Sequence, residues 1–169
     1  MSLSPDFEHR NCRRLPVVLV LALVLAGCAT GPAPDTAGVR APAVHGSVER
    51  GRILSVARNA IGAPYRYGGD TPGGFDCSGL VHFAHRTAGI DVPRTADMQW
   101  RHARRTTSAQ VRPGDLLFFS LGGDKARHVG IYEGDGLFIH APSSGKRVGR
   151  ASLDNPYWRT RLIGTGTFL

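Results

Sequence analysis

The amino-acid sequence predicts an α+β domain, with helix-forming segments in its first half and strand-forming segments in its second half. In the first half, apolar residues recur three and four positions apart, which is typical of amphipathic helices. The second half carries short apolar runs bounded by Gly, Asp and Pro turns, which favour antiparallel strands. A chain of 169 residues suits one domain with one core.

Residues 1–27 predict an export signal rather than part of this fold. Three arginines between positions 10 and 14 precede an apolar run over 15–26. That run is too short to cross a hydrocarbon core of about 30 Å as a helix, and a basic flank before a short apolar run is typical of a secretory signal. It ends in Leu25-Ala26-Gly27-Cys28, which resembles the bacterial lipobox. The resemblance implies that Cys28 becomes the lipidated first residue of the mature protein.

Residues 28–46 predict the lipidated Cys and a flexible tether. The segment is rich in Ala, Pro and Gly and has almost no large apolar side chains, so it cannot bury enough surface to fold. The predicted organisation is therefore a signal over 1–27, a tethered lipid site over 28–46 and a folded domain over 47–169.

Three helices are expected in the first half of the domain. The first starts at Ser47 and is stopped by Gly62 and Pro64, and a Gly-rich loop follows it. The second runs from Cys77 to about Thr87, with Asp76 as its N-cap and Gly89 after its end. Its inward face is predicted to hold Leu80, Val81, Ala84 and Ala88, and His82 and His85 are interpreted as exposed positions. A third short helix is expected near 95–105.

The second half predicts antiparallel strands. A turn at 112–115 precedes a strand over 116–120, and two further strands over 127–133 and 137–141 flank Gly134-Asp135-Gly136. A last strand is expected over 162–169. Runs of helices followed by runs of strands indicate an α+β fold rather than alternating βαβ units.

Cys77 is the candidate nucleophile. Cys12 leaves with the signal and Cys28 carries lipid, so Cys77 is the one free thiol expected in the mature chain. Exported proteins normally pair their cysteines, and an unpaired one is a candidate reactive thiol. Its position at a helix start favours the thiolate, because the free N–H groups and the positive end of the dipole stabilise an anion.

The predicted hairpin brings two histidines together. If residues 134–136 form a three-residue loop, position 130 pairs with position 140, and His128 and His140 become diagonal neighbours about 7–8 Å apart on one face. A two-residue loop would place them on opposite faces. Gly130 shares their face and leaves room beside them, whereas Val129, Ile131 and Ile139 point into the core. A thiol, a His base and a second His to orient it form a set suited to nucleophilic catalysis.

The charge of the chain is less informative. The net charge is +8, spread along the chain and contributed mostly by Arg. Nucleic acid is the usual partner of a basic protein, but an exported lipoprotein rarely meets it, so no nucleic-acid partner is expected. The carboxylates of the cell wall are a better polyanion, and most of the charge is interpreted as a solvated surface.

Six motif blocks, in this order, resemble the NlpC family of cell-wall cysteine peptidases, including its short lipoprotein members of the Spr (MepS) type. The resemblance covers about 48–169 and includes Pro156-Tyr157-Trp158. The blocks are Tyr65-Arg66-Tyr67-Gly68-Gly69, Asp76-Cys77-Ser78-Gly79, Pro93-Arg94-Thr95, Arg112-Pro113-Gly114-Asp115-Leu116, Arg127-His128-Val129-Gly130-Ile131-Tyr132 and His140-Ala141.

The resemblance implies a papain-like fold, in which N-terminal helices pack on a central antiparallel sheet and the nucleophile heads a helix. By position it implies that Cys77 is the nucleophile, His128 the general base and His140 the residue that orients the base. It also implies that Tyr65 contacts the substrate or oxyanion and that Asp76 and Ser78 line the cleft. The implied enzyme is a monomeric peptidoglycan endopeptidase that needs no cofactor or metal.

Several alternatives remain open at this point. The same fold and thiol could serve an amidase or acyltransferase with a non-wall substrate, and the chain could be an inactive wall-binding lipoprotein. A zinc hydrolase built on Cys77, His128 and His140 would have only three protein ligands and no nearby catalytic Glu. Two bonds also remain possible as the one that is cleaved: the D-alanyl–diaminopimelate bond, which resemblance to the Spr type favours, and the γ-D-glutamyl–diaminopimelate bond. Ala29 after the lipid site predicts the outer membrane, facing the periplasm.

Overall fold

The computed structural model describes residues 42–122 and 128–169. The expected signal over 1–27, the lipid site at Cys28, the tether up to residue 41 and Arg127 lie outside the described residues. No helix of the described part is long and apolar enough to span a membrane.

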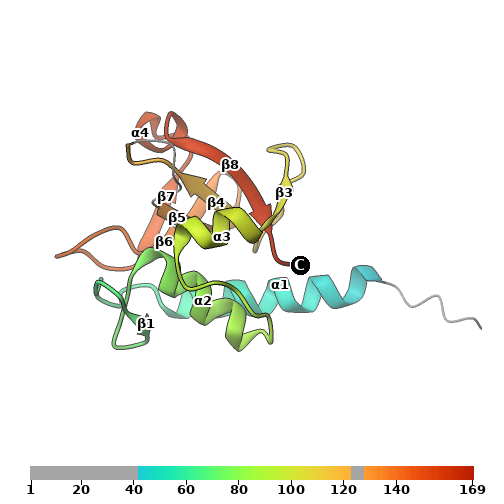
Figure 1. The fold of residues 1–169 in the computed structure, drawn as a ribbon, viewed down its shortest axis with the longest axis horizontal. Coiled ribbons are helices and arrows are strands. Elements are labelled where there is room, and N and C mark those ends of the chain that lie inside the picture. The colour runs from blue at the N-terminus through green and yellow to red at the C-terminus, as the bar shows by residue number, and fades with distance from the viewer. Residues whose placement is uncertain (1–41, 123–127) are drawn as a thin grey trace, which may run out of the picture. The chain divides into compact units, whose positions relative to one another are not determined.

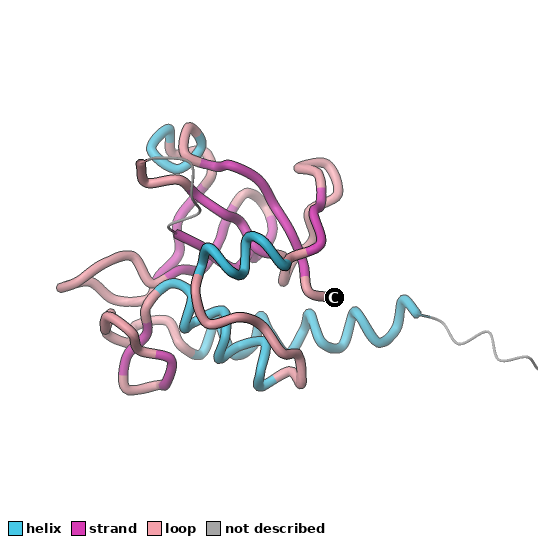
Figure 2. Tube along the Cα trace, viewed as in Figure 1, coloured by secondary structure: helices cyan, strands magenta, loops and turns pink. Residues whose placement is uncertain are grey.

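The described chain forms four helices and eight strands, which gives the α+β architecture predicted from the sequence. Helices α1 and α2 lie together below the sheet in Figure 1, and Figure 2 shows the same division between helices and strands. The elements are α1 Pro42–Asn59, β1 Asp70–Thr71, β2 Gly74–Phe75, α2 Cys77–Thr87, α3 Ala96–His102, β3 Arg104–Thr106, β4 Leu116–Phe119, β5 His128–Gly134, β6 Leu137–His140, β7 Gly149–Ser152, α4 Pro156–Arg159 and β8 Leu162–Thr167.

Six of the strands form one antiparallel sheet in the order β3-β8-β4-β5-β6-β7, and β1 pairs with β2 in a small separate hairpin. Strand β4 divides the core. Leu116 and Phe118 pack with the buried faces of α1 and α2, whereas Leu117 and Phe119 pack on the opposite side with Phe138. All four β4 residues are fully buried, as expected of a strand covered on both faces.

The second helix forms as its sequence predicts. The Asp76 carboxylate accepts a hydrogen bond of 2.7 Å from the backbone N–H of Gly79, which satisfies one of the free amides at the helix start. Gly89 follows the helix end with a φ of 83°, a left-handed conformation that favours glycine. The predicted inward residues Leu80, Val81, Ala84 and Ala88 are all buried.

The β5–β6 hairpin has the predicted register but a different turn. Ile131 pairs with Ile139 and Tyr132 with Phe138, the register that aligns position 130 with 140. The turn itself has two residues, Asp135 and Gly136, both with positive φ, and a bulge between Tyr132 and Gly134 supplies the extra residue. The expectation of a three-residue loop was wrong, yet the shared face survives because the bulge compensates for the shorter turn.

Several boundaries differ from the predictions. Helix α1 begins at Pro42, so residues 42–46, expected in the tether, belong to the first helix. Helix α3 ends at His102, and the segment expected to continue it to residue 105 enters β3 and pairs with β8. The short elements β1, β2, β7 and α4 were not predicted, because segments of two to four residues show little periodicity.

The interpretation of His82 and His85 as exposed was wrong. His82 is half-buried, with its Nδ1 2.9 Å from the Val92 carbonyl. His85 is fully buried, with its Nδ1 2.9 Å from the Val81 carbonyl and its ring edge-on to Phe168. The helical spacing of His85 from Val81 and Ala88 already placed it on the inward face. Burial lowers the pKa of His85 to about 4.

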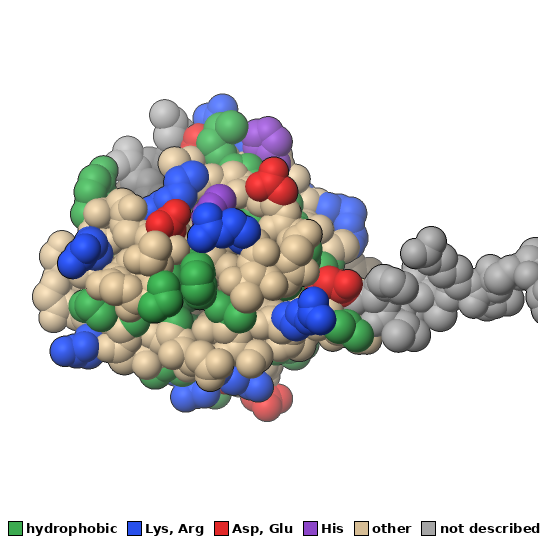
Figure 3. Space-filling model, turned by 90° about the horizontal axis from the view of Figure 1, so that it is seen from below, with side chains coloured by type: hydrophobic (Ala, Val, Ile, Leu, Met, Phe, Trp, Pro, Cys, Tyr) green, Lys and Arg blue, Asp and Glu red, His purple; other side chains and the backbone are tan. Residues whose placement is uncertain are grey.

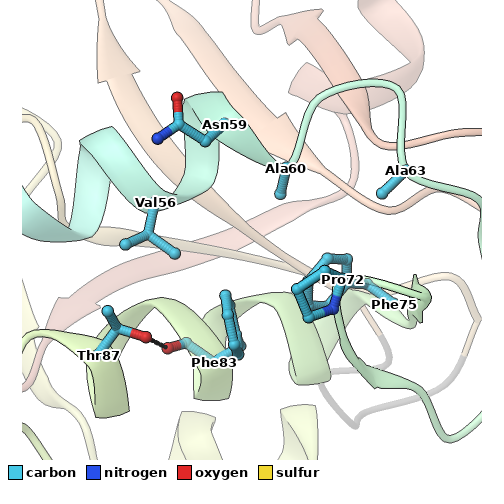
Figure 4. Close-up of a pocket in the computed structure, with 8 residues that line it drawn as sticks. All are labelled: Val56, Asn59, Ala60, Ala63, Pro72, Phe75, Phe83 and Thr87. Carbon is cyan, nitrogen blue, oxygen red and sulfur yellow. Dashed lines mark hydrogen bonds between the residues drawn. The ribbon is translucent and has the colours of Figure 1, made fainter.

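The surface of the domain carries one small apolar pocket of about 240 Å³ between α1, α2 and the β1–β2 loop. Val56 of α1 and Phe83 of α2 point toward each other across it in Figure 4. On the face shown in Figure 3, Lys and Arg side chains are spread over the surface and hydrophobic side chains gather near its centre. The basic residues of that face therefore form no single patch.

The buried His85 leads to a prediction for stability in acid. The unfolded chain protonates this residue below about pH 6.5, whereas the folded chain resists protonation down to about pH 4. Stability therefore falls as the pH drops through this window, by at most about 1.4 kcal/mol per pH unit for one group. In His85→Phe, which keeps a ring beside Phe168, the urea unfolding midpoint should fall less steeply with acidification than in the wild type. Parallel pH dependences would contradict this origin of acid sensitivity.

Candidate active site

Cys77 is the first residue of α2 and lies in a cleft of about 720 Å³. The thiol is half-buried and is the free cysteine of the described residues. Three predicted site residues, Tyr65, Asp76 and Ser78, line the same cleft. Its other lining residues are Tyr67, Gly68, Arg94, Thr95, Ala96 and Asp97.

The Cys77 sulfur lies against β5. Burial raises the pKa of the thiol, and hydrogen bonds from backbone groups of Val129 and Ser78 oppose this rise. The contact with Val129 places the sulfur beside the residue that follows His128. We expected the helix start to favour the thiolate, and that expectation was wrong for the free site, where burial outweighs the backbone contacts.

His128 and His140 meet as the hairpin register predicts. His128 Nε2 lies 2.8 Å from His140 Nδ1, and the two rings are perpendicular, with centroids 5.1 Å apart. Both side chains are buried. Since this contact uses Nε2 of His128, its Nδ1 is the nitrogen left for another partner.

An aromatic cluster surrounds the histidine pair. The Trp158 ring stacks on His128 with centroids 5.3 Å apart and meets His140 edge-on at 4.8 Å. From the sheet, Phe119 contacts His128 and Trp158, and Phe138 contacts His140 and Trp158. Trp158 is carried by α4, whose start is capped by the Asn155 side chain. The cluster limits the rotation of both imidazoles.

Burial also keeps the pair neutral. It lowers the pKa of His128 to about 3, with the neighbouring His140 as a smaller cause, and that of His140 to about 4. With both rings neutral, one must donate and the other accept in the 2.8 Å contact. If His128 donates through Nε2, its Nδ1 is unprotonated and can accept a proton.

Tyr65 lies close to the thiol. Its main chain is fixed by a bridge to Phe75 and by its N–H, which donates to the Lys146 carbonyl at 2.9 Å. Burial raises the pKa of the Tyr65 hydroxyl, and the nearby Cys77 and Asp76 raise it further. The hydroxyl therefore stays protonated at neutral pH and can donate a hydrogen bond within the cleft.

The Asp76 carboxylate is occupied by hydrogen bonds that hold the cleft wall together. It caps α2 and accepts from Arg94 at 3.0 and 2.7 Å, a bidentate pair. Burial acts against ionisation of Asp76, but the Arg94 contact and the capping amide outweigh it and lower the pKa. Ser78 joins the network by donating to Asp76 at 3.0 Å and accepting from Arg94 at 3.1 Å. Both residues are thus occupied as helix cap and cleft wall.

A model of the NlpC/P60 family matches residues 62–167, which include every element of this site. The chain belongs to the NlpC/P60 family. It is 38% identical over 148 residues to the probable endopeptidase NlpC of Escherichia coli, covering 86% of this chain and 94% of that relative.

Two further proteins are similar to this chain, one by sequence and one by its solved structure. The murein DD-endopeptidase MepH of Escherichia coli is 42% identical over 109 residues, which cover 62% of this chain and 40% of MepH. The chain thus spans less than half of that relative. The solved NlpC/p60 domain of the peptidoglycan hydrolase SagA matches with a TM-score of 0.61 at 31% identity, covering 70% of this chain and 97% of that domain. The fold is therefore that of solved NlpC/P60 domains.

Sequence reasoning did not assign roles to two residues of the site. Arg94 holds Asp76, and Trp158 covers the histidine pair. Arg94 stood in one of the six blocks, and Trp158 lay within the residues that the resemblance covers. Within 42–122 and 128–169, no three or more His, Cys, Asp or Glu side chains are grouped so as to hold a metal ion.

Proposed function

We propose that the protein is a peptidoglycan hydrolase, a cysteine endopeptidase that cleaves peptide bonds of the cell-wall stem peptide or cross-link. One arrangement carries the proposal. A half-buried thiol heads α2 with its sulfur at the backbone of Val129, and His128, the residue before Val129 on β5, is held by His140 across β5–β6. The names of NlpC, MepH and SagA agree with this activity.

In this proposal His128 takes the Cys77 proton through Nδ1 while the sulfur attacks the peptide carbonyl. The Nε2–H of His128 donates to His140 throughout, so the imidazolium keeps its hydrogen bond and its orientation. His140 is a neutral acceptor and supplies no negative charge. Protonated His128 then gives its proton to the leaving amine, and water resolves the thioester.

The negative charge that develops on the carbonyl oxygen during the attack must be stabilised by hydrogen-bond donors in the cleft. The backbone amides at the start of α2 and the protonated Tyr65 hydroxyl lie close to the thiol, and we assign them to this role. Asp76 and Ser78 shape the wall of the cleft, and Arg94 fixes that wall.

We also propose the arrangement of the whole chain: a signal over 1–27, a lipid on Cys28 and a tether that ends where α1 begins at Pro42. This would hold a monomeric enzyme at the outer membrane, facing the periplasm and the wall. A solved structure from Staphylococcus aureus, 34% identical to this chain, is described as similar to a lipoprotein, which supports the lipid site alone.

Loss of the thiol tests the function itself. Cys77→Ala should lower the release of soluble muropeptides from purified sacculi by at least about ten-thousandfold, because no other group can form the thioester. His128→Ala should cost nearly as much, and circular dichroism should show an unchanged fold in both. Mass spectrometry of wild-type products identifies the bond. Full activity of Cys77→Ala would exclude the proposed mechanism. If the wild-type protein cleaved simple amides but left sacculi undigested, an amidase would be favoured instead.

The histidine pair predicts graded effects at position 140. In His140→Asn the amide oxygen can still accept from His128 Nε2, so activity should stay within about tenfold of the wild type. In His140→Ala that buried N–H loses its partner, and activity should fall about a hundredfold or more. Sacculus hydrolysis by the two variants at matched concentration provides the measurement. Equal activities would remove His140 from the site.

The lipid anchor predicts a change of location without a change of chemistry. Cys28→Ala should hydrolyse sacculi in vitro at the wild-type rate but appear in the soluble periplasmic fraction, since acyl chains supply the membrane affinity. Fractionation and the intact mass of the native protein give the readout. A native protein that is soluble and carries an unmodified Cys28 would refute the anchor and leave the hydrolase proposal standing.

A further inference from the structure

A second polar pocket, of about 260 Å³, opens between α1, β3 and the turn that precedes β4. Four arginines from these three segments line it: Arg50, Arg104, Arg105 and Arg112. None of them lines the cleft around Cys77. Three of the four are exposed, and Arg50 is largely buried, with 18% of its side chain accessible.

A buried carboxylate builds one wall of this arginine pocket. Asp115, only 1% exposed, accepts from Nη1 of Arg50 at 2.7 Å. The same Nη1 donates to the Pro113 carbonyl at 3.1 Å. The other Asp115 oxygen accepts from the backbone N–H of Arg112 at 2.8 Å. Arg50 is therefore held through one nitrogen, while its Nε and Nη2 remain as donors.

The opposite wall is also held in place. The guanidinium of Arg105 lies 3.0 Å from the centroid of the Trp100 ring, a cation–π contact that fixes a long side chain. Arg104 donates through Nη2 to the Leu169 oxygen at 2.7 Å. The guanidinium groups of Arg50, Arg104 and Arg105 are thus restrained by contacts that leave some of their N–H groups unused. Less side-chain entropy is therefore lost at these three positions when a ligand binds.

The charges in the arginine pocket are not balanced. Asp115 forms an ion pair with Arg50, and among the described residues no Asp or Glu side chain forms one with Arg104, Arg105 or Arg112. Arg104 has the Leu169 oxygen as its partner. Gln110 lines the same pocket, and its Oε1 accepts from Thr107, which leaves its amide N–H groups as further donors. The pocket is thus rich in donors and carries excess positive charge.

We propose that the arginine pocket binds a phosphate group, as a phosphate ester or a phospholipid headgroup. Guanidinium groups approach from three segments of the chain, and the tetrahedral oxygens of a phosphate can accept from several directions at once. A planar carboxylate would be satisfied by a single bidentate arginine. The site is separate from the catalytic cleft, so its occupancy does not require the proposed hydrolase activity.

Titration with inorganic phosphate tests the site. The purified full-length protein should bind phosphate saturably by calorimetry at constant ionic strength, with chloride as the reference anion. Arg105→Gln and Arg112→Gln should each weaken binding about tenfold, since each removes charge-assisted hydrogen bonds. Arg86→Gln, an exposed arginine on α2 outside this pocket, is the matched control and should leave binding unchanged. Absence of saturable binding, or an equal loss in Arg86→Gln, would overturn the proposal.

A second experiment distinguishes a phospholipid headgroup from a soluble phosphate ester as the ligand. Cys28→Ala removes the acyl anchor, so vesicle flotation of this variant reports binding by the protein itself, and the added Arg105→Gln change shows how much of that binding the pocket contributes. Binding to phosphatidylglycerol vesicles but not to phosphatidylcholine vesicles, lost in Arg105→Gln, would identify a lipid headgroup. Binding of glycerol phosphate without vesicle binding would identify a soluble ester. Vesicle binding that persists in both Arg105→Gln and Arg112→Gln would show that the pocket does not hold the headgroup and would overturn the lipid assignment.

Discussion

The contact between His128 and His140 depends on a single extra residue in β5. With a two-residue turn at Asp135-Gly136, a regular hairpin would place the two rings on opposite faces of the sheet. Glu133 is the additional residue, inserted between the Tyr132–Phe138 pair and the Gly134–Leu137 pair. It shifts the register by one position, so that both imidazoles enter the same aromatic cluster and meet at 2.8 Å.

The side chain of Glu133 also ties this bulge to its surroundings. Its carboxylate pairs with Arg58 of α1 at 2.7 Å and with Arg150 of β7 at 2.6 Å. The hydrogen bond from Arg150 is the largest cause of its lowered pKa, and burial acts in the opposite direction. Exposed ion pairs are individually weak, but these two connect three elements at the point where the register is set. The position of the proposed base is therefore tied to α1 and β7, neither of which lines the cleft.

The sequence predicted features that local signals determine. The Asp76 cap, the inward face of α2 and the pairing of position 130 with 140 each follow from residue type and spacing over a few positions. The bulge could not be predicted, because Gly134-Asp135-Gly136 suits both a three-residue loop and a two-residue turn with an added residue. The roles of Arg94 and Trp158 rest on contacts between segments distant in the chain, which no local pattern records. His85 is different, since its spacing from Val81 and Ala88 indicated burial although it was interpreted as exposed.

Burial around the site sets the order of the proposed chemistry. In the free protein, a proton moved from Cys77 to His128 would leave two charges in surroundings that raise the pKa of the thiol and lower that of the imidazole. The transfer becomes favourable when attack on a carbonyl carries the negative charge from sulfur to oxygen, within reach of the helix amides and the Tyr65 hydroxyl. At the same time the imidazolium gains the face of Trp158 and keeps its bond to His140. In this proposal, burial of the thiol and of the imidazole together keeps the thiol protonated until a substrate carbonyl is in place.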